Sequence, residues 1–240
     1  EDLLHVVMTP PEYFFGGEEQ TNIFQRSIEF INNNGKGHVR ITHTAPETKE
    51  LAEEILKIQV NRYKEKGIIP QSAVPKKILF SEFTNENRFV FFYRLTNHLE
   101  NEVFSCKDIK DISIKPEDNS VLPEGISWMN RMKKIIISGE ALDKTFFMKE
   151  KTYHSSLILW NIEAVFSFDY KGEKGTVTIC LGFPDYSKNG SNAEFEIAIN
   201  SLNCDNRLSS RDKKKLESQL LSEMDKQKSQ VYSNFTDYLN

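Results

Sequence analysis

Three strand-like segments in the second half of the chain constrain its fold more than any other feature. Each is rich in β-branched or aromatic residues: SSLILWNIEAVFSFDY (155–170), GTVTICLGF (175–183) and AEFEIAINSL (193–202). Turn-forming residues separate them, first Lys171-Gly172 and then Lys188-Asn189-Gly190. The pattern predicts three consecutive strands. The stretch KKIIISGEAL (133–142) predicts a further strand ahead of them, running into a turn.

Helical periodicity marks other parts of the chain. Residues 45–66 form the strongest predicted helix, which Gly67 ends. A charged helix is predicted at about 209–235, and apolar spacing predicts another at 20–32. HVRITHT (38–44) alternates like a strand, and LLHVVM is an apolar strand candidate. The stretches KKILFSEF, RFVFFYRL and KDISIK fit strands or short helices.

This mixture of helices and strands predicts an α/β protein. With 240 residues the chain is long enough to bury a real core, and it shows neither an internal repeat nor a clean linker. We therefore expect a single α/β domain over residues 1–240, with the charged helix at its C-terminal end.

Composition narrows the classes of partner and compartment. The net charge of −4 argues against a general nucleic-acid binder, and no apolar run approaches the roughly 20 residues that span a bilayer. Three scattered cysteines fit neither a disulfide framework nor a zinc site, which favours a reducing, cytoplasmic setting. Secretion stays open, because Asn189 and Asn234 begin glycosylation sequons and the first residue, a Glu, indicates a trimmed chain.

Three positions carry groups that fit covalent catalysis. Glu12 follows the apolar stretch LLHVVM, Lys149 and Lys151 precede a hydrophobic segment, and Cys180 lies near the end of a predicted strand. In open α/β sheets ligands bind beyond the carboxyl ends of strands, so Glu12 and Cys180 occupy plausible places for a site.

These residues resemble the Glu–Lys–Cys triad of the nitrilase, or carbon–nitrogen hydrolase, superfamily. Pro11-Glu12-Tyr13 is similar to the setting of the family glutamate, and GTVTIC followed by Phe183-Pro184-Asp185 is similar to the family's cysteine strand. Lys151 precedes Cys180 by about the usual separation and matches one branch better than Lys149. The resemblance implies an α-β-β-α sandwich, with an insertion within residues 33–130.

The resemblance also implies a mechanism and a partner. Glu12 would act as general base for the Cys180 thiol, and Lys151 with the Leu181 N–H would stabilise the charge that attack creates. Hydrolysis of an amide or nitrile would pass through a thioester and need no metal or organic cofactor. Family members commonly form homodimers, so a homodimer acting on a small amide or nitrile is expected.

Other interpretations stay open. Gly182 stands where family members usually carry an aspartate, which favours an inactive relative or an unrelated α/β protein that acts as an interaction module. A third possibility pairs Cys180 with His154 as a cysteine–histidine dyad, as in cysteine proteases. Cys106 and Cys204 have no supporting context, and we interpret both as structural.

Overall fold

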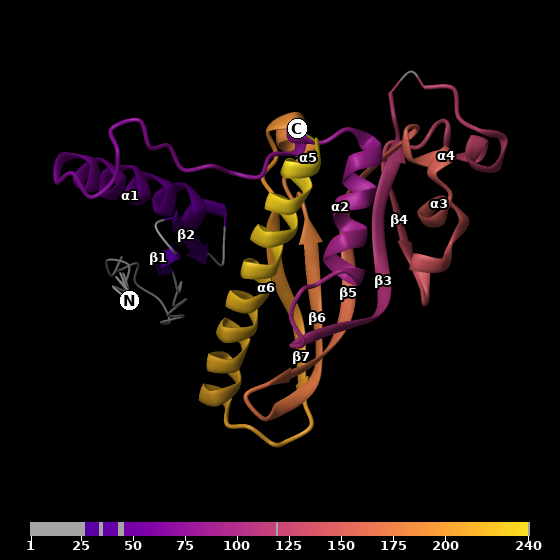
Figure 1. Cartoon of the computed structure of the whole chain (residues 1–240). Coiled ribbons are helices and arrows are strands. Elements are labelled where there is room, and N and C mark those ends of the chain that lie inside the picture. The colour runs from indigo at the N-terminus through magenta and orange to yellow at the C-terminus, as the bar shows by residue number, and fades with distance from the viewer. Residues whose placement is uncertain (1–26, 34–35, 43–45, 119, 240) are drawn as a thin grey trace, which may run out of the picture. The chain divides into compact units, whose positions relative to one another are not determined.

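The computed structural model describes residues 27–33, 36–42, 46–118 and 120–239. They fall into two compact units, the first within residues 1–76 and the second spanning residues 77–240 (Figure 1). The α/β prediction is confirmed at the level of a mixed helix and strand structure. No described helix is long and apolar enough to cross a membrane.

The first unit contains a hairpin followed by a helix. Strand β1 (Ser27–Asn33) pairs antiparallel with β2 (Lys36–Thr42), and helix α1 spans Pro46–Glu65. The helix predicted at 45–66 is confirmed, and the strand predicted at 38–44 is confirmed over residues 38–42. The helix expected at 20–32 is wrong for residues 27–32, which belong to β1. The apolar run within residues 27–32 is short enough to fit either a helical or a strand period. Its pairing with β2 makes it a strand. The predicted strand at the N-terminus lies outside the described residues.

The second unit is built on one antiparallel sheet of five strands in the order β4-β3-β5-β6-β7. The strands are β3 (Phe104–Pro116), β4 (Ile135–Ser138), β5 (Leu157–Tyr170), β6 (Glu173–Gly182) and β7 (Glu196–Cys204). All four strands predicted in the second half of the chain are therefore confirmed. KDISIK, which fitted a strand or a short helix, belongs to β3.

The turn between β5 and β6 shows why two of these strands pair. Lys171 and Gly172 have φ of 51° and 89°, the left-handed conformation that a two-residue hairpin turn requires at both positions. The turn sets the register, so that Glu163 of β5 lies opposite Cys180 of β6. Because every neighbouring pair of strands is antiparallel, adjacent strands end at opposite edges of this sheet. The ligand rule for parallel sheets therefore does not apply to it.

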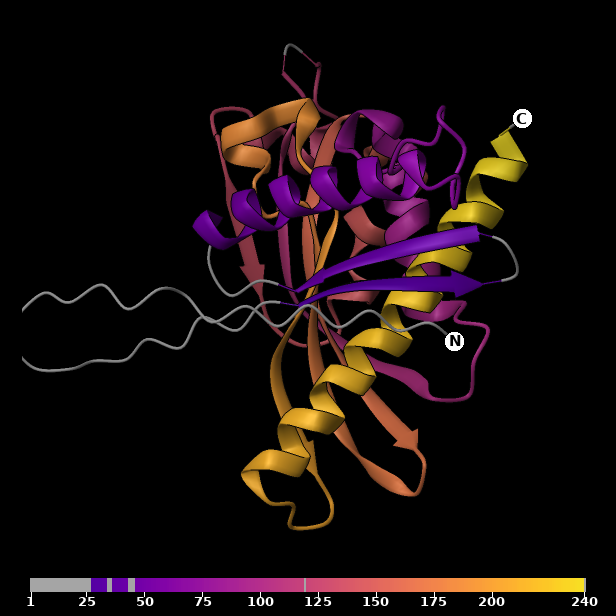
Figure 2. The same cartoon turned by 90° about the vertical axis from the view of Figure 1, so that its left-hand side faces the viewer.

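Two long helices, α2 (Asn85–Asn97) and α6 (Ser210–Leu239), cover one face of the sheet (Figures 1 and 2). The stretch RFVFFYRL forms α2, which begins where the Thr84 hydroxyl accepts a hydrogen bond from the Asn87 N–H at 3.2 Å. Its fully buried Phe91, Phe92 and Leu95 join the core between the layers. The C-terminal charged helix is confirmed, four residues longer than predicted at its end.

Short helices connect these elements. They are η1 (Phe80–Glu82), η2 (Glu124–Met129), η3 (Leu142–Lys144), α3 (Phe146–Lys149), α4 (Lys151–His154), α5 (Tyr186–Asn189) and η4 (Gly190–Asn192). Three of them, η3, α3 and α4, lie between β4 and β5 and position Lys149, Lys151 and His154.

Candidate functional site

Cys180 lies on the face of the sheet opposite the two long helices. Along β6 the side chains of Val177, Ile179 and Leu181 are buried, and Cys180 alternates with them onto the other face. Its neighbours across the strands are Glu163 of β5 and Ala198 of β7. The Cys180 side chain is half-buried.

The surroundings of Cys180 disfavour its thiolate. Burial raises the pKa of the thiol, and the nearby carboxylates of Glu163, Asp111 and Glu196 raise it further. The Cys180 Sγ donates a hydrogen bond to Asn161 Oδ1 at 3.1 Å. This hydrogen bond to Asn161 acts in the opposite direction and lowers the pKa of the thiol. Carboxylates dominate the charge near the sulfur.

The structure does not bring the predicted lysine to the cysteine. Lys151 begins α4 and Lys149 ends α3, and both side chains are exposed. Within the described part of the chain, no hydrogen bond or ion pair joins either lysine to Cys180. Glu12 lies outside the described residues, so the Glu12–Lys151–Cys180 triad stays a prediction.

His154 has a packing role. Its ring stacks on Phe89 of α2 at a centroid distance of 4.0 Å, and Nε2 contacts the Met148 carbonyl oxygen at 3.1 Å. Burial lowers the pKa of this imidazole. Because His154 packs against a helix that covers one face and Cys180 points from the other, the structure does not form the cysteine–histidine dyad.

The residues after Cys180 are explained by packing. A Cβ at Gly182 would lie 2.5 Å from the Trp160 carbonyl oxygen, so only glycine fits where β6 passes β5. Phe183 is fully buried, with its ring 5.2 Å from those of Phe80 and Phe195. The Phe-Pro-Asp motif therefore contributes a core anchor to this fold.

A second candidate site consists of exposed apolar side chains that sequence analysis did not single out. Among the residues of the second unit whose side chains the structure describes (77–118 and 120–235), six large apolar side chains are exposed, and five of them fall between residues 121 and 146. We call these five the 121–146 surface: Val121, Trp128, Met132, Ile136 and Phe146. Exposed apolar residues gathered in this way mark binding surfaces more often than scattered ones.

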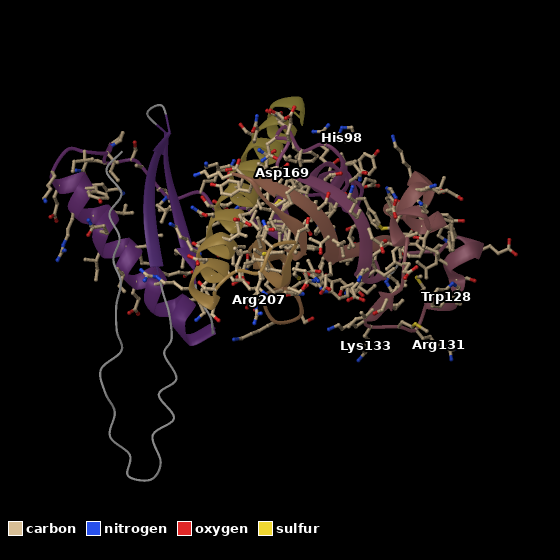
Figure 3. All side chains as sticks on the ribbon, turned by 90° about the horizontal axis from the view of Figure 1, so that it is seen from below. His98, Trp128, Arg131, Lys133, Asp169 and Arg207 are labelled. Carbon is tan, nitrogen blue, oxygen red and sulfur yellow. The ribbon has the colours of Figure 1, made fainter. Side chains whose placement is uncertain are left out.

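Basic residues accompany this surface. Arg131, Lys133 and Lys134 are exposed, and none forms an ion pair with another described residue. Figure 3 shows Trp128, Arg131 and Lys133 at the same end of the second unit. The sequence does carry a signal for this site, because SWMNRMKK alternates apolar and basic residues inside a run, 125–139, that contains no acidic residue.

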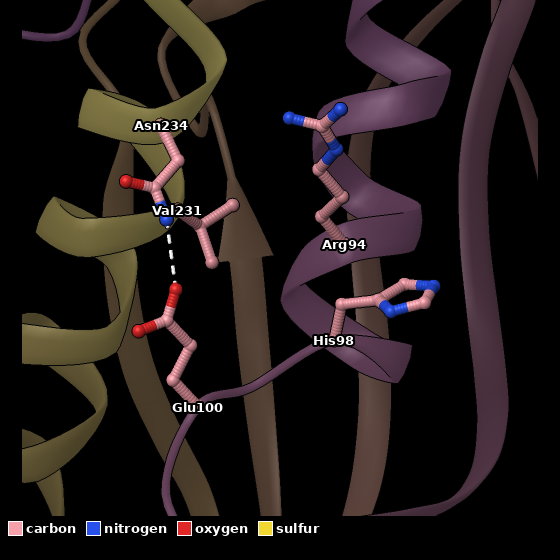
Figure 4. Close-up of a pocket in the computed structure, with 5 residues that line it drawn as sticks. All are labelled: Arg94, His98, Glu100, Val231 and Asn234. Atoms are coloured by element: carbon pink, nitrogen blue, oxygen red, sulfur yellow. Dashed lines mark hydrogen bonds between the residues drawn. The ribbon is translucent and has the colours of Figure 1, made fainter.

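A shallow hollow between α2 and α6 is the third feature (Figure 4). It is lined by Arg94, His98, Glu100, Val231 and Asn234. The Asn234 amide donates to Glu100 Oε1 at 2.7 Å, and the Gln230 amide donates to the other carboxylate oxygen. The carboxylate is thus already satisfied by two amides, which indicates a structural role for this hollow.

The described residues and the comparisons with known proteins add no further candidate site. Among the described residues, no group of three or more His, Cys, Asp or Glu side chains is arranged to hold a metal ion. Comparisons with protein-family models, with curated proteins and with solved structures found no match for this chain.

Proposed function

We propose that this chain is an interaction module that binds its partner through the 121–146 surface. The observation that carries the proposal is that, of the six large apolar side chains described as exposed in the second unit, five fall within 26 residues of sequence. Burying such side chains against a partner releases water from apolar surface, which is the main driving force for association. Exposing these large apolar side chains to water does not stabilise the protein itself.

The surroundings of Cys180 also favour an interaction module over a cysteine hydrolase. A nucleophilic cysteine is activated by an adjacent general base or by a lowered pKa, which a cation, a histidine or a helix N-terminus supplies. Cys180 instead has its pKa raised by burial and by three carboxylates. Its described neighbours therefore suit a neutral thiol in a polar sheet face.

The second candidate is the carbon–nitrogen hydrolase, with Cys180 as nucleophile, Glu12 as base and Lys151 as charge stabiliser. One observation favours it: the Cys180 thiol is half-buried rather than enclosed in the core, and it lies beside the polar side chain of Asn161. This candidate carries with it the α-β-β-α sandwich and the homodimer that the resemblance implies, and Glu12 would have to reach Cys180 from its own part of the chain.

Thiol alkylation separates the two functions. The full chain is treated with limiting iodoacetamide at pH 7 and pH 9, and the modified cysteines are identified by mass spectrometry. For an interaction module, Cys180 alkylates no faster than Cys204 at pH 7, and its rate rises toward pH 9 as the thiolate forms. For a hydrolase, Cys180 alkylates fastest at pH 7, and Glu12→Gln or Lys151→Ala slows it.

A matched pair of variants tests the electrostatic argument itself. Glu163→Gln removes the carboxylate opposite Cys180 and should speed its alkylation, because one charge that opposes the thiolate is gone. Glu102→Gln removes an exposed carboxylate just before the other end of β3 and should leave the rate unchanged. Equal rates in the unchanged chain and both variants would contradict the contribution of the Glu163 carboxylate to the raised pKa of Cys180.

A further inference from the structure

The 121–146 surface is held in an outward orientation by buried anchors. Ile126 and Met129 of η2 are fully buried, whereas Trp128 between them is 55% exposed. Gly125 lies directly against Tyr153, whose ring contacts that of Phe146 at 5.3 Å, which ties the η2 turn to α3. The projection of Trp128 therefore results from a firmly packed turn.

The charge of this region is opposite to that of the whole chain. Over residues 121–146 four basic residues outnumber the three acidic ones, Glu124, Glu140 and Asp143. The run 125–139 within it carries three cations and no acidic residue, although the chain has a net charge of −4. Arg131, Lys133 and Lys134 have no ion-pair partner in the described part of the chain, so their charges are available to an external anion. An anionic partner is therefore complementary to this end of the second unit.

The chemistry of the apolar side chains distinguishes among anionic partners. Val121, Met132 and Ile136 are aliphatic or thioether side chains, which gain from an apolar phase and cannot stack on bases as aromatic rings do. Trp128 combines an apolar body with an N–H, the composition that is enriched at the headgroup level of bilayers. An interface that offers both anionic groups and hydrocarbon is a lipid surface.

We propose that the 121–146 surface docks on an anionic lipid bilayer. Trp128 and Met132 enter the headgroup region, while Arg131, Lys133 and Lys134 contact lipid phosphates and carboxylates. This inference rests on the proposed interaction function and names its partner. The lipid proposal is measured by vesicle binding and tryptophan emission, whereas the proposed interaction function is measured by alkylation of Cys180. Either proposal can therefore fail while the other holds.

Tryptophan emission reports this docking directly. The chain has two tryptophans, Trp128 at 55% exposed and Trp160 at 5%. The full chain is titrated with phosphatidylcholine vesicles and with vesicles that also contain about 30% phosphatidylserine. Anionic vesicles should shift the emission to shorter wavelength and sediment the protein. Trp128→Phe should abolish the shift, since Trp160 stays in the core.

A matched pair of triple variants tests the role of the cations. Replacing Arg131, Lys133 and Lys134 by Gln should weaken partition onto anionic vesicles by about fivefold per charge, on the order of 100-fold in total. The control replaces Lys213, Lys214 and Lys215 by Gln. These lysines are also exposed, and their replacement removes the same charge, but they lie in the first turns of α6. The control should bind as the unchanged chain does.

Each alternative result overturns the proposal in a defined way. Equal binding to neutral and anionic vesicles, or equal loss in both triple variants, refutes the assigned role of the three cations. Sedimentation without a Trp128 emission shift refutes insertion. A single-stranded oligonucleotide that binds through Arg131, Lys133 and Lys134 while vesicles do not bind assigns the surface to nucleic acid. If the protein does not bind vesicles but forms a dimer that Trp128→Ala dissociates, the 121–146 surface binds a second copy of the chain.

Discussion

Gly182→Ala is the most direct test of how the sheet is packed around Cys180. A methyl group at this position would lie 2.5 Å from the Trp160 carbonyl oxygen, 2.4 Å from Asn161 Oδ1 and 2.7 Å from Asn161 Cα. Real Cβ contacts stay beyond about 3 Å, so β6 and β5 must separate by roughly half an ångström. The Trp160 carbonyl also accepts the hydrogen bond from the Phe183 N–H at 2.7 Å, and the separation weakens it.

The expected destabilisation follows from these two terms. Overpacking a close contact costs about 1–3 kcal/mol, and a weakened buried backbone hydrogen bond adds about 1 kcal/mol. We expect Gly182→Ala to lower the free energy of unfolding by about 2–4 kcal/mol and the urea midpoint by roughly 1–2 M. Urea unfolding followed by tryptophan emission is the assay, because both tryptophans lie in the second unit.

Thr176→Ala is the matched control. Thr176 lies on the same strand and the same face as Gly182 but is exposed, so its replacement should cost well under 1 kcal/mol. Gly182→Ala should also change the alkylation rate of Cys180, since it displaces the Asn161 amide that accepts from the thiol. A loss below about 0.5 kcal/mol for Gly182→Ala would refute the claim that the strands meet too closely for a side chain.

Two further predictions concern the core. Phe183→Ala should lower the free energy of unfolding by about 3–5 kcal/mol, because loss of a fully buried ring leaves a cavity among Phe80, Phe92 and Phe195. The same urea assay measures this loss. A loss near zero would contradict the core position of Phe183. His154 has a lowered pKa when folded, so the unfolded chain binds more protons below about pH 6.5 and stability falls as the pH falls from there. His154→Gln should make this dependence shallower by at most about 1.4 kcal/mol per pH unit, as measured by urea unfolding at pH 7.5 and 5.5; an unchanged slope would refute the role of His154.

The candidate sites show where inference from sequence stops. The position of Cys180 on a strand followed from its apolar flanks, but the identity of its neighbours did not. Glu163 and Asn161 are 17 and 19 residues away, and the hairpin register alone brings them beside the thiol. Lys151 is 29 residues from Cys180 in sequence, and it stays exposed in α4. Motif order carries no information about which face of a sheet each side chain occupies.

The sequence by itself determined the β5–β6 turn and the long helices α1 and α6. Two positive-φ turn residues, Lys171 and Gly172, delimit the β5–β6 hairpin, and long amphipathic periods define α1 and α6, because these preferences depend only on neighbours within one or two turns of chain. Tertiary structure decided whether the short aromatic stretch RFVFFYRL became a helix and residues 27–32 a strand. It also decided that Trp128 projects while Ile126 and Met129 are buried. Burial and strand pairing are contacts between distant residues, and a short apolar run is compatible with either period until those contacts form.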